Sequence, residues 1–223
     1  YNAIMLETAA SNQENRRNAA IIATMVAAFF VALALIHPLA LLGLPIAGFA
    51  YWWWRRRTTR RLAVIANPLP PEIETDLQRY VAYFRALDDA GKERFRDLVK
   101  VFLDEVPITG IRTDVDCTTR TLVAASAIIP IFGFDDWEYS GLGEILIYPN
   151  RFGEDFSTDG DQNVQRHTLG MVGVGHLSGV MILVKPDLLA GFTNPNDKRN
   201  VGIHEFAHLV DKADGSIDGL PAG

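Results

Sequence analysis

Residues 202–211 read GIHEFAHLVD and contain the pattern H-E-x-x-H at His204, Glu205 and His208. Nothing between 198 and 211 disfavours a helix except one glycine, so this segment is predicted to be helical. Histidines four positions apart project from the same helix face about one turn apart, and both can therefore ligate a single ion. The stretch predicts a metal-binding helix.

The residue types in this pattern point to zinc chemistry. Zinc prefers imidazole nitrogen, and a carboxylate at Glu205 can take the proton of a metal-bound water as general base. Asp211 lies seven residues after His204 on the same stripe, where it can hold a ligand ring in one tautomer. The alternatives are that Asp211 is a solvated acid at the helix end and that the two histidines are paired by chance.

Two histidines do not complete a catalytic zinc site, which takes three protein ligands and one open position. No His follows His208, and no Glu follows Glu205. The remaining acids are aspartates in or just after the same helix, at 211, 214 and 218. We therefore predict that the third ligand lies beyond Gly223 and that the chain is a fragment.

A long apolar block occupies residues 18–54, which contain no Lys, Arg, Asp or Glu. One straight helix over this block would be about 55 Å long, nearly twice the hydrocarbon thickness of a bilayer. Because His37-Pro38 lies midway, we predict a two-helix transmembrane hairpin with membrane lipid around it. One tilted span with an interfacial piece is the alternative.

The flanks of this block indicate its orientation. A tail over 1–17 precedes it, and a basic juxtamembrane segment and linker follow over 55–70. Arginines lie at both outer ends, and Trp52, Trp53 and Trp54 can form an aromatic belt at the interface. The positive-inside bias then places both ends, and the domain that follows, in the cytoplasm of a bacterium.

Charge and cysteine content exclude several functions for the remainder of the chain. From Leu62 onward there are 14 basic and 25 acidic residues, a net charge of −11. Such a surface repels phosphate backbones, so no nucleic-acid binding is expected. Cys117 is the sole cysteine, so a cysteine-based zinc site and an internal disulfide are both excluded.

Residues 71–223 are predicted to form one α+β domain. Apolar residues recur at helical spacing over 73–87 and 95–103, and Asp116 can cap a third helix that ends at Pro130. Two apolar runs bounded by Gly and Pro, 144–148 and 179–184, indicate strands. The second run is either a core strand or an edge strand along which a peptide lies. Residues 194–197 offer N-caps for the H-E-x-x-H helix.

The sequence resembles the Mlc titration factor A family of glucose-regulated zinc peptidases. The resemblance is carried by 202–211, by the tail DGSIDGLP at 214–221 and by GEILIYP at 143–149, and it extends over about 71–223. It implies a zincin-like α+β metallopeptidase domain, aminopeptidase-type activity, one zinc ion and a Glu ligand on a later helix. A transcriptional-regulator partner is implied by the resemblance only, and no residue can be assigned to it.

Together these features predict a zinc metallopeptidase held at the inner face of a bacterial membrane and acting on peptides or proteins. A membrane quality-control protease of the heat-shock type also joins a hairpin to H-E-x-x-H and is one alternative. A non-catalytic, membrane-tethered regulatory binding protein that uses zinc structurally is the other.

Overall fold

The computed structural model describes residues 9–134, 138–139, 141–149, 170–172, 179–193 and 200–213. The chain divides into two compact units, Tyr1–Asn67 and Pro68–Gly223, which are treated separately. The tail at 214–221 lies outside the described residues.

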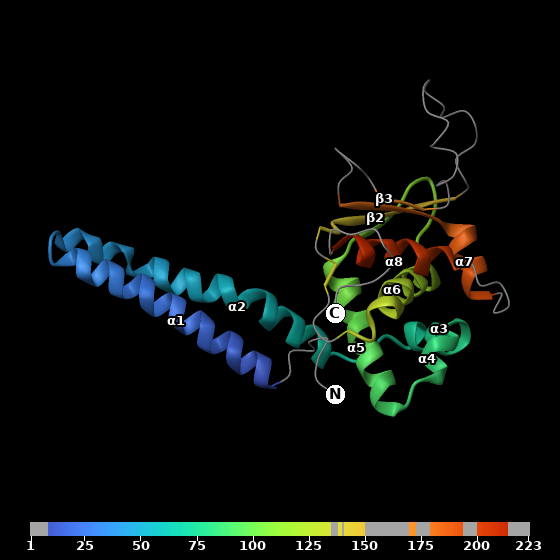
Figure 1. Cartoon of the computed structure of the whole chain (residues 1–223), viewed down its shortest axis with the longest axis horizontal. Coiled ribbons are helices and arrows are strands. Elements are labelled where there is room, and N and C mark those ends of the chain that lie inside the picture. Colours follow the sequence, from blue (N-terminus) through green and yellow to red (C-terminus); the bar gives the residue numbers. More distant parts are fainter. Residues whose placement is uncertain are drawn as a thin grey trace, which may run out of the picture. The chain divides into compact units, whose positions relative to one another are not determined.

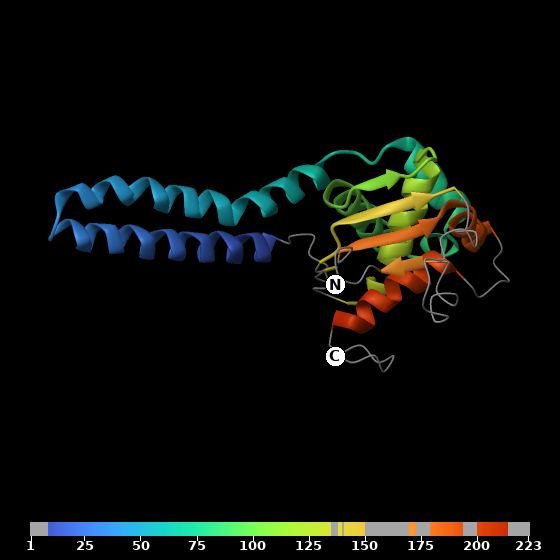
Figure 2. The same cartoon turned by 90° about the horizontal axis from the view of Figure 1, so that it is seen from above.

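The first unit is a pair of antiparallel helices, α1 (Ala9–Ala34) and α2 (Leu44–Ala66), joined through a 3-10 helix, η1 (Pro38–Gly43) (Figures 1 and 2). The chain reverses at His37, whose extended backbone (φ −144°, ψ 113°) precedes Pro38 as the sequence predicts. Among the described helices, one stretch, Asn12–Ala34, is long and apolar enough to cross a membrane. Helix α2 continues beyond the predicted block of 18–54, through the arginines that follow its tryptophans, and ends at Ala66.

The second unit contains a four-stranded sheet in the order β1-β2-β4-β3 (Figure 2). Its strands are β1 (Ile108–Gly110), β2 (Glu144–Tyr148), β3 (Gly170–Val172) and β4 (Val180–Val184). The first two and β4 are parallel, while β3 runs antiparallel to β4. The strands predicted at 144–148 and 179–184 are thereby confirmed.

The edge-strand alternative for 179–184 is wrong. Each residue from Val180 to Val184 is in register with a residue of β2, and β3 pairs along the other side at Met181, Ile182 and Leu183. The strand therefore lies inside the sheet. β3, with three residues and a glycine, carries too weak a pattern to be predicted.

The helices of the second unit are α3 (Pro71–Tyr80), α4 (Ala82–Ala86), α5 (Asp89–Glu105), α6 (Cys117–Ile131), α7 (Lys185–Thr193) and α8 (Val201–Ala213). The predicted stripe over 73–87 forms two helices because Val81 leaves helical geometry (φ −98°, ψ 92°). The sequence does not predict α7, since Pro186 was assigned only to the end of a strand. Proline is compatible with the first turn of a helix.

The core of this unit is built around α6, in which every residue from Thr121 to Ile128 is buried. The helix packs against α3, α5, α7 and α8, and Figure 1 shows it with α8 beneath the sheet. The buried hydroxyls of Thr121 and Ser126 donate to carbonyls one turn earlier, at Cys117 and Leu122. The polar atoms inside this helix are thus satisfied locally.

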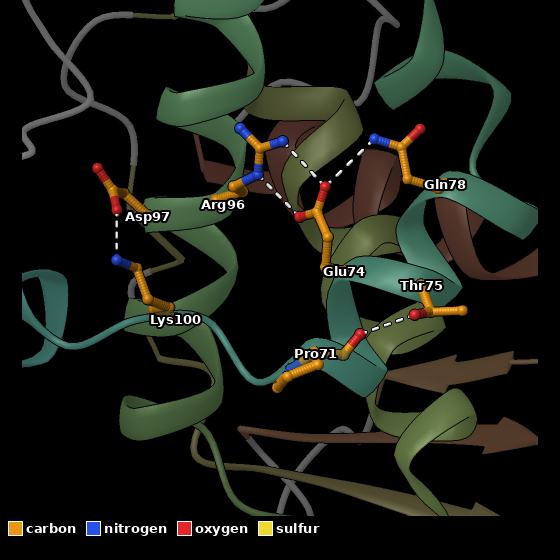
Figure 3. Close-up of polar contacts among 7 residues, drawn as sticks. All are labelled: Pro71, Glu74, Thr75, Gln78, Arg96, Asp97 and Lys100. Carbon is orange, nitrogen blue, oxygen red and sulfur yellow. Dashed lines mark hydrogen bonds and ion pairs between the residues drawn. The ribbon is translucent and has the colours of Figure 1, made fainter.

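An ion pair joins α3 to α5. The guanidinium of Arg96 donates two hydrogen bonds to the carboxylate of Glu74, at 2.8 and 2.9 Å, and Gln78 donates a third at 3.2 Å (Figure 3). The hydrogen bond from Arg96 lowers the pKa of Glu74 below its usual value. On the same helix, Lys100 pairs with Asp97 at 2.6 Å.

Candidate metal centre

The helix that carries H-E-x-x-H begins at an asparagine cap. The Oδ1 atom of Asn200 accepts a hydrogen bond from the backbone N–H of Ile203 at 3.0 Å, as an N-cap does. The Nδ2 atom of the same side chain donates to the carbonyl of Gly191 in α7, also at 3.0 Å. The cap is therefore Asn200; residues 194–197, where it was predicted, lie outside the described residues.

The face of α8 that meets α6 begins at Gly202. A Cβ atom at this position would overlap Oγ of Ser126 and come within 2.9 Å of Cδ1 of Leu188. The absence of a side chain therefore lets the first turn of α8 lie directly on α6. The sequence alone indicates only that this glycine lowers the helix propensity of the segment. Its role in the close approach of α8 to α6 depends on Ser126 and Leu188, which lie elsewhere in the chain.

Phe206 fixes the middle of the same face. Its side chain is fully buried between the rings of Phe102 and Tyr139, with centroids at 5.9 and 5.2 Å. The hydroxyl of Tyr139 donates to the carbonyl of Ala127 at 2.6 Å, and burial raises the pKa of this phenol. These contacts determine which side of α8 faces the core.

The opposite face of α8 presents the two histidines. The side chains of His204 and His208 are exposed, and their Nε2 atoms lie 3.0 Å apart, with ring centroids 4.3 Å apart. At this distance one ring nitrogen donates to the other, or both ring nitrogens can bind one ion. The structure thus brings the predicted ligand pair together at the atoms that would hold a metal.

The geometry of this pair fits zinc. With Zn–N bonds of about 2.0–2.1 Å, two ligands at a tetrahedral ion are about 3.3 Å apart. The observed separation of 3.0 Å differs from this by a few tenths of an ångström, which small ring rotations can supply. Neutral imidazoles on one helix face are also a donor set that zinc favours.

The described residues do not complete the site. Among them there is no group of three or more His, Cys, Asp or Glu side chains that could hold a metal ion. Glu205 and Asp211 are both half-buried, on α8 with the histidines. Their assignments, to the general base and to the support of a ligand ring, stay predictions.

The sheet lies close to this helix. Strand β3 contacts α8 and pairs with β4 on its inner side, and within the described residues its outer side has no strand partner. The two histidines of the H-E-x-x-H pattern therefore lie on a helix that contacts the antiparallel end of the sheet.

The chain matches the model of a known protein family. Residues 51–223 match the family model described as glucose-regulated metallo-peptidase M90. The match covers more than half of the chain, and the chain belongs to this family. The resemblance predicted from the motif and its neighbouring segments is thereby confirmed.

The chain is also similar to an uncharacterized protein of Synechocystis sp. The two are 26% identical over 180 residues, which are 78% of this chain and 63% of the relative. The chain thus spans less than two thirds of that relative's length.

Proposed function

We propose that the protein is a membrane-anchored, zinc-dependent metallopeptidase of the aminopeptidase type. The single observation that supports this most strongly is the pair of histidine Nε2 atoms 3.0 Å apart on the exposed face of α8, in a chain of a metallo-peptidase family. Neither a soluble core nor a helix cap requires two exposed imidazoles to converge in this way.

The functional residues of α8 have separate roles in this proposal. His204 and His208 would hold the ion through Nε2, and a zinc ion bound there would supply Lewis acidity toward the scissile carbonyl and the attacking water. Glu205 accepts the proton of the attacking water and delivers it to the leaving amine. Asp211 would orient a histidine ring by accepting a hydrogen bond from the ring N–H that does not face the metal.

The third ligand in this proposal is a Glu that follows Gly223. Two facts support it: the described residues supply no third donor, and no Glu follows Glu205 in the sequence. The family resemblance assigns a glutamate from a later helix to this role.

The substrate in this proposal is a peptide or protein in extended conformation. The outer side of β3 has backbone groups that no described strand pairs with, so an extended peptide can add there beside α8. The preference for an amino terminus comes from the family resemblance. A transcriptional-regulator partner rests on that resemblance alone.

The anchor is the helix pair of the first unit, inserted through residues 18–54. Its apolar stretch over Asn12–Ala34 is long enough for a membrane, and the arginines at both outer ends favour a cytoplasmic location for both. The catalytic domain then lies at the inner face of a bacterial cytoplasmic membrane.

The test uses the full-length protein and a pair of matched glutamate variants. Glu205→Gln should retain one zinc per chain and lose about 10²- to 10⁴-fold in kcat/KM on small aminoacyl substrates, since it removes the general base. Glu93→Gln alters an exposed glutamate on α5 and should leave both quantities unchanged. Unchanged activity in Glu205→Gln would exclude this residue as the base.

The same assay separates the alternatives. Bound zinc with no hydrolysis of any peptide would favour the regulatory binding protein. Cleavage inside unfolded membrane proteins, with free amino termini left intact, would favour the quality-control protease.

A further inference from the structure

The contact between α1 and α2 is made by small residues. The buried side chains and backbone along it are those of Ala19, Gly43, Ala47 and Thr58. A Cβ atom at Gly43 would overlap the ring of Phe30 on the facing helix. Close packing through Gly, Ala and Thr is characteristic of helix pairs in membranes.

Large apolar side chains cover the outside of the same pair. Exposed fractions of 50% or more are found for Ile21, Met25, Phe29, Val31, Leu35, Ile36, Leu39, Leu42, Ile46, Phe49, Trp52 and Trp53. A soluble helix pair would bury such residues against its partner. The arrangement is that of a structure whose solvent is lipid.

The basic end of the pair is closed by a polar clamp. Nη1 of Arg55 on α2 donates to Oδ1 of Asn12 at 2.7 Å and to Oδ1 of Asn15 at 3.2 Å, both on α1. The guanidinium of Arg56 lies 3.9 Å from the ring centre of Trp53. The clamp fixes the register of the helices and brings the arginines to the level of the aromatic belt.

The opposite end, the tip, is apolar. We define the tip as residues 35–42, in which Leu35 is 89% exposed and Ile36 82%. His37 is the only polar side chain in the tip, and neither this segment nor the arms from 18 to 54 contain a charge. A turn that emerged into water on the far side of a membrane would not need so many exposed large apolar residues.

The backbone of the tip also suits hydrocarbon. The N–H groups of Leu35, Ile36 and His37 donate to carbonyls of the last turn of α1, and the N–H of Ala40 donates to the carbonyl of His37. Pro38 has no N–H group to satisfy. Because unpaired backbone groups are costly in lipid, these internal hydrogen bonds lower the cost of placing the turn at membrane depth.

The charge-free part of each arm is shorter than the hydrocarbon layer. Asn12–Ala34 reaches the length of a span only with Glu14, Arg16 and Arg17 included, and its charge-free part, residues 18–34, extends about 26 Å at 1.5 Å per residue. From Trp53 in the aromatic belt to the start of η1, α2 and η1 together extend at most about 26 Å, using 1.5 and 2.0 Å per residue. The hydrocarbon layer is about 30 Å thick. With the belt at one interface, the tip therefore ends inside the far leaflet.

We propose that α1 and α2 form a one-sided membrane wedge, which enters and leaves through the cytoplasmic face and buries its 35–42 tip in the hydrocarbon of the far leaflet. This inference rests on the proposed membrane anchoring and specifies its depth. The partner of the tip is the acyl-chain region of the bilayer. The arginines beside the aromatic belt contact the lipid headgroups.

The test is cysteine accessibility in membrane vesicles of both orientations. The full-length protein is made with Cys117 replaced by Ser, and single cysteines are placed at Ile36 in the tip, at Phe29 in the arm and at Thr59. The last is exposed on α2 beyond the belt. A membrane-impermeant maleimide is applied before and after the membrane is dissolved in detergent.

The wedge predicts that Ile36→Cys is protected in both orientations, with labelling at least about tenfold below that in detergent, because a thiol in hydrocarbon does not ionise. Phe29→Cys should show the same protection, and Thr59→Cys should react in vesicles that expose the cytoplasmic face. Rapid labelling of Ile36→Cys from the opposite face would overturn the wedge and leave the anchor intact. Recovery of the protein in the soluble fraction, with all three cysteines labelled, would overturn the anchoring and the wedge together.

Discussion

Replacing Gly202 by Ala should destabilise the second unit, although Ala is the better helix former. In an exposed helix interior this change gains about 1 kcal/mol. Here the new Cβ would overlap Oγ of Ser126 and lie 3.0 Å from its Cβ and 2.9 Å from Leu188 Cδ1. Overpacking of a core costs about 1–3 kcal/mol. Because one atom overlaps directly and two more lie at 3.0 Å or less, we take the upper part of this range, about 2–3 kcal/mol, and after the gain in helix propensity we expect a net loss of about 1–2 kcal/mol in the free energy of unfolding.

The assay is urea unfolding of the full-length protein in mild detergent, followed by circular dichroism. Gly133→Ala is the matched control, because a Cβ there meets nothing within 4 Å; it should change stability by less than about 0.5 kcal/mol. Adding Ser126→Ala removes the overlapping oxygen and should recover about 1 kcal/mol of the loss as a coupling energy. A Gly202→Ala variant as stable as the parent would refute the close packing of α8 on α6.

The remaining predictions concern the ligands and the response to acid. His204→Ala and His208→Ala should each weaken zinc binding by more than about 100-fold in competition with a chelator, since even a supporting partner of a ligand is worth about 10- to 100-fold. Asp211→Asn should weaken zinc binding by about 10- to 100-fold, because the carboxylate of Asp211 is proposed to orient a histidine ring. A variant that binds zinc as tightly as the parent would show that Asp211 is a solvated acid instead. Burial raises the pKa of Asp116, but hydrogen bonds from Thr119 and Lys185 outweigh this effect and lower the pKa to about 2. The pKa of Glu74 is also lowered, by its hydrogen bond from Arg96. Both carboxylates contribute stability that is present above their unfolded pKa values near 4 and is lost as the pH falls through their lower folded pKa values, about 2 for Asp116. An Asp116→Asn, Glu74→Gln variant should therefore unfold with a flatter pH dependence below about pH 4.

The parts of the fold that the sequence predicts are those with a strong local pattern. The strand at 144–148 is bounded by Gly143 and Pro149. Asp116 directly precedes α6 and caps it, because its side chain accepts a hydrogen bond from the N–H of Thr119 at 2.8 Å. Each of these signals lies within a few residues of the element that it determines. The order of the strands is not local, and β3 was missed because three residues carry no periodicity.

The candidate site, too, could be predicted from the sequence only where the signal is local. The spacing of His204 and His208 predicts a shared face, because helical geometry alone brings them together. The role of Gly202 and the identity of the cap could not be predicted. The first depends on Ser126, 76 positions earlier in the chain, and the second on the carbonyl of Gly191 in a helix that the sequence does not indicate.

The central claim is that the two imidazoles of α8 hold a catalytic zinc ion. X-ray absorption at the zinc edge of the full-length Glu205→Gln protein tests it most directly, because this variant should keep the metal while losing the general base. A zinc ion held by these imidazoles should show nitrogen and oxygen ligands at about 2.0–2.1 Å, with the outer-shell scattering of two imidazole rings. A spectrum without imidazole scattering, or a protein without zinc, would contradict it.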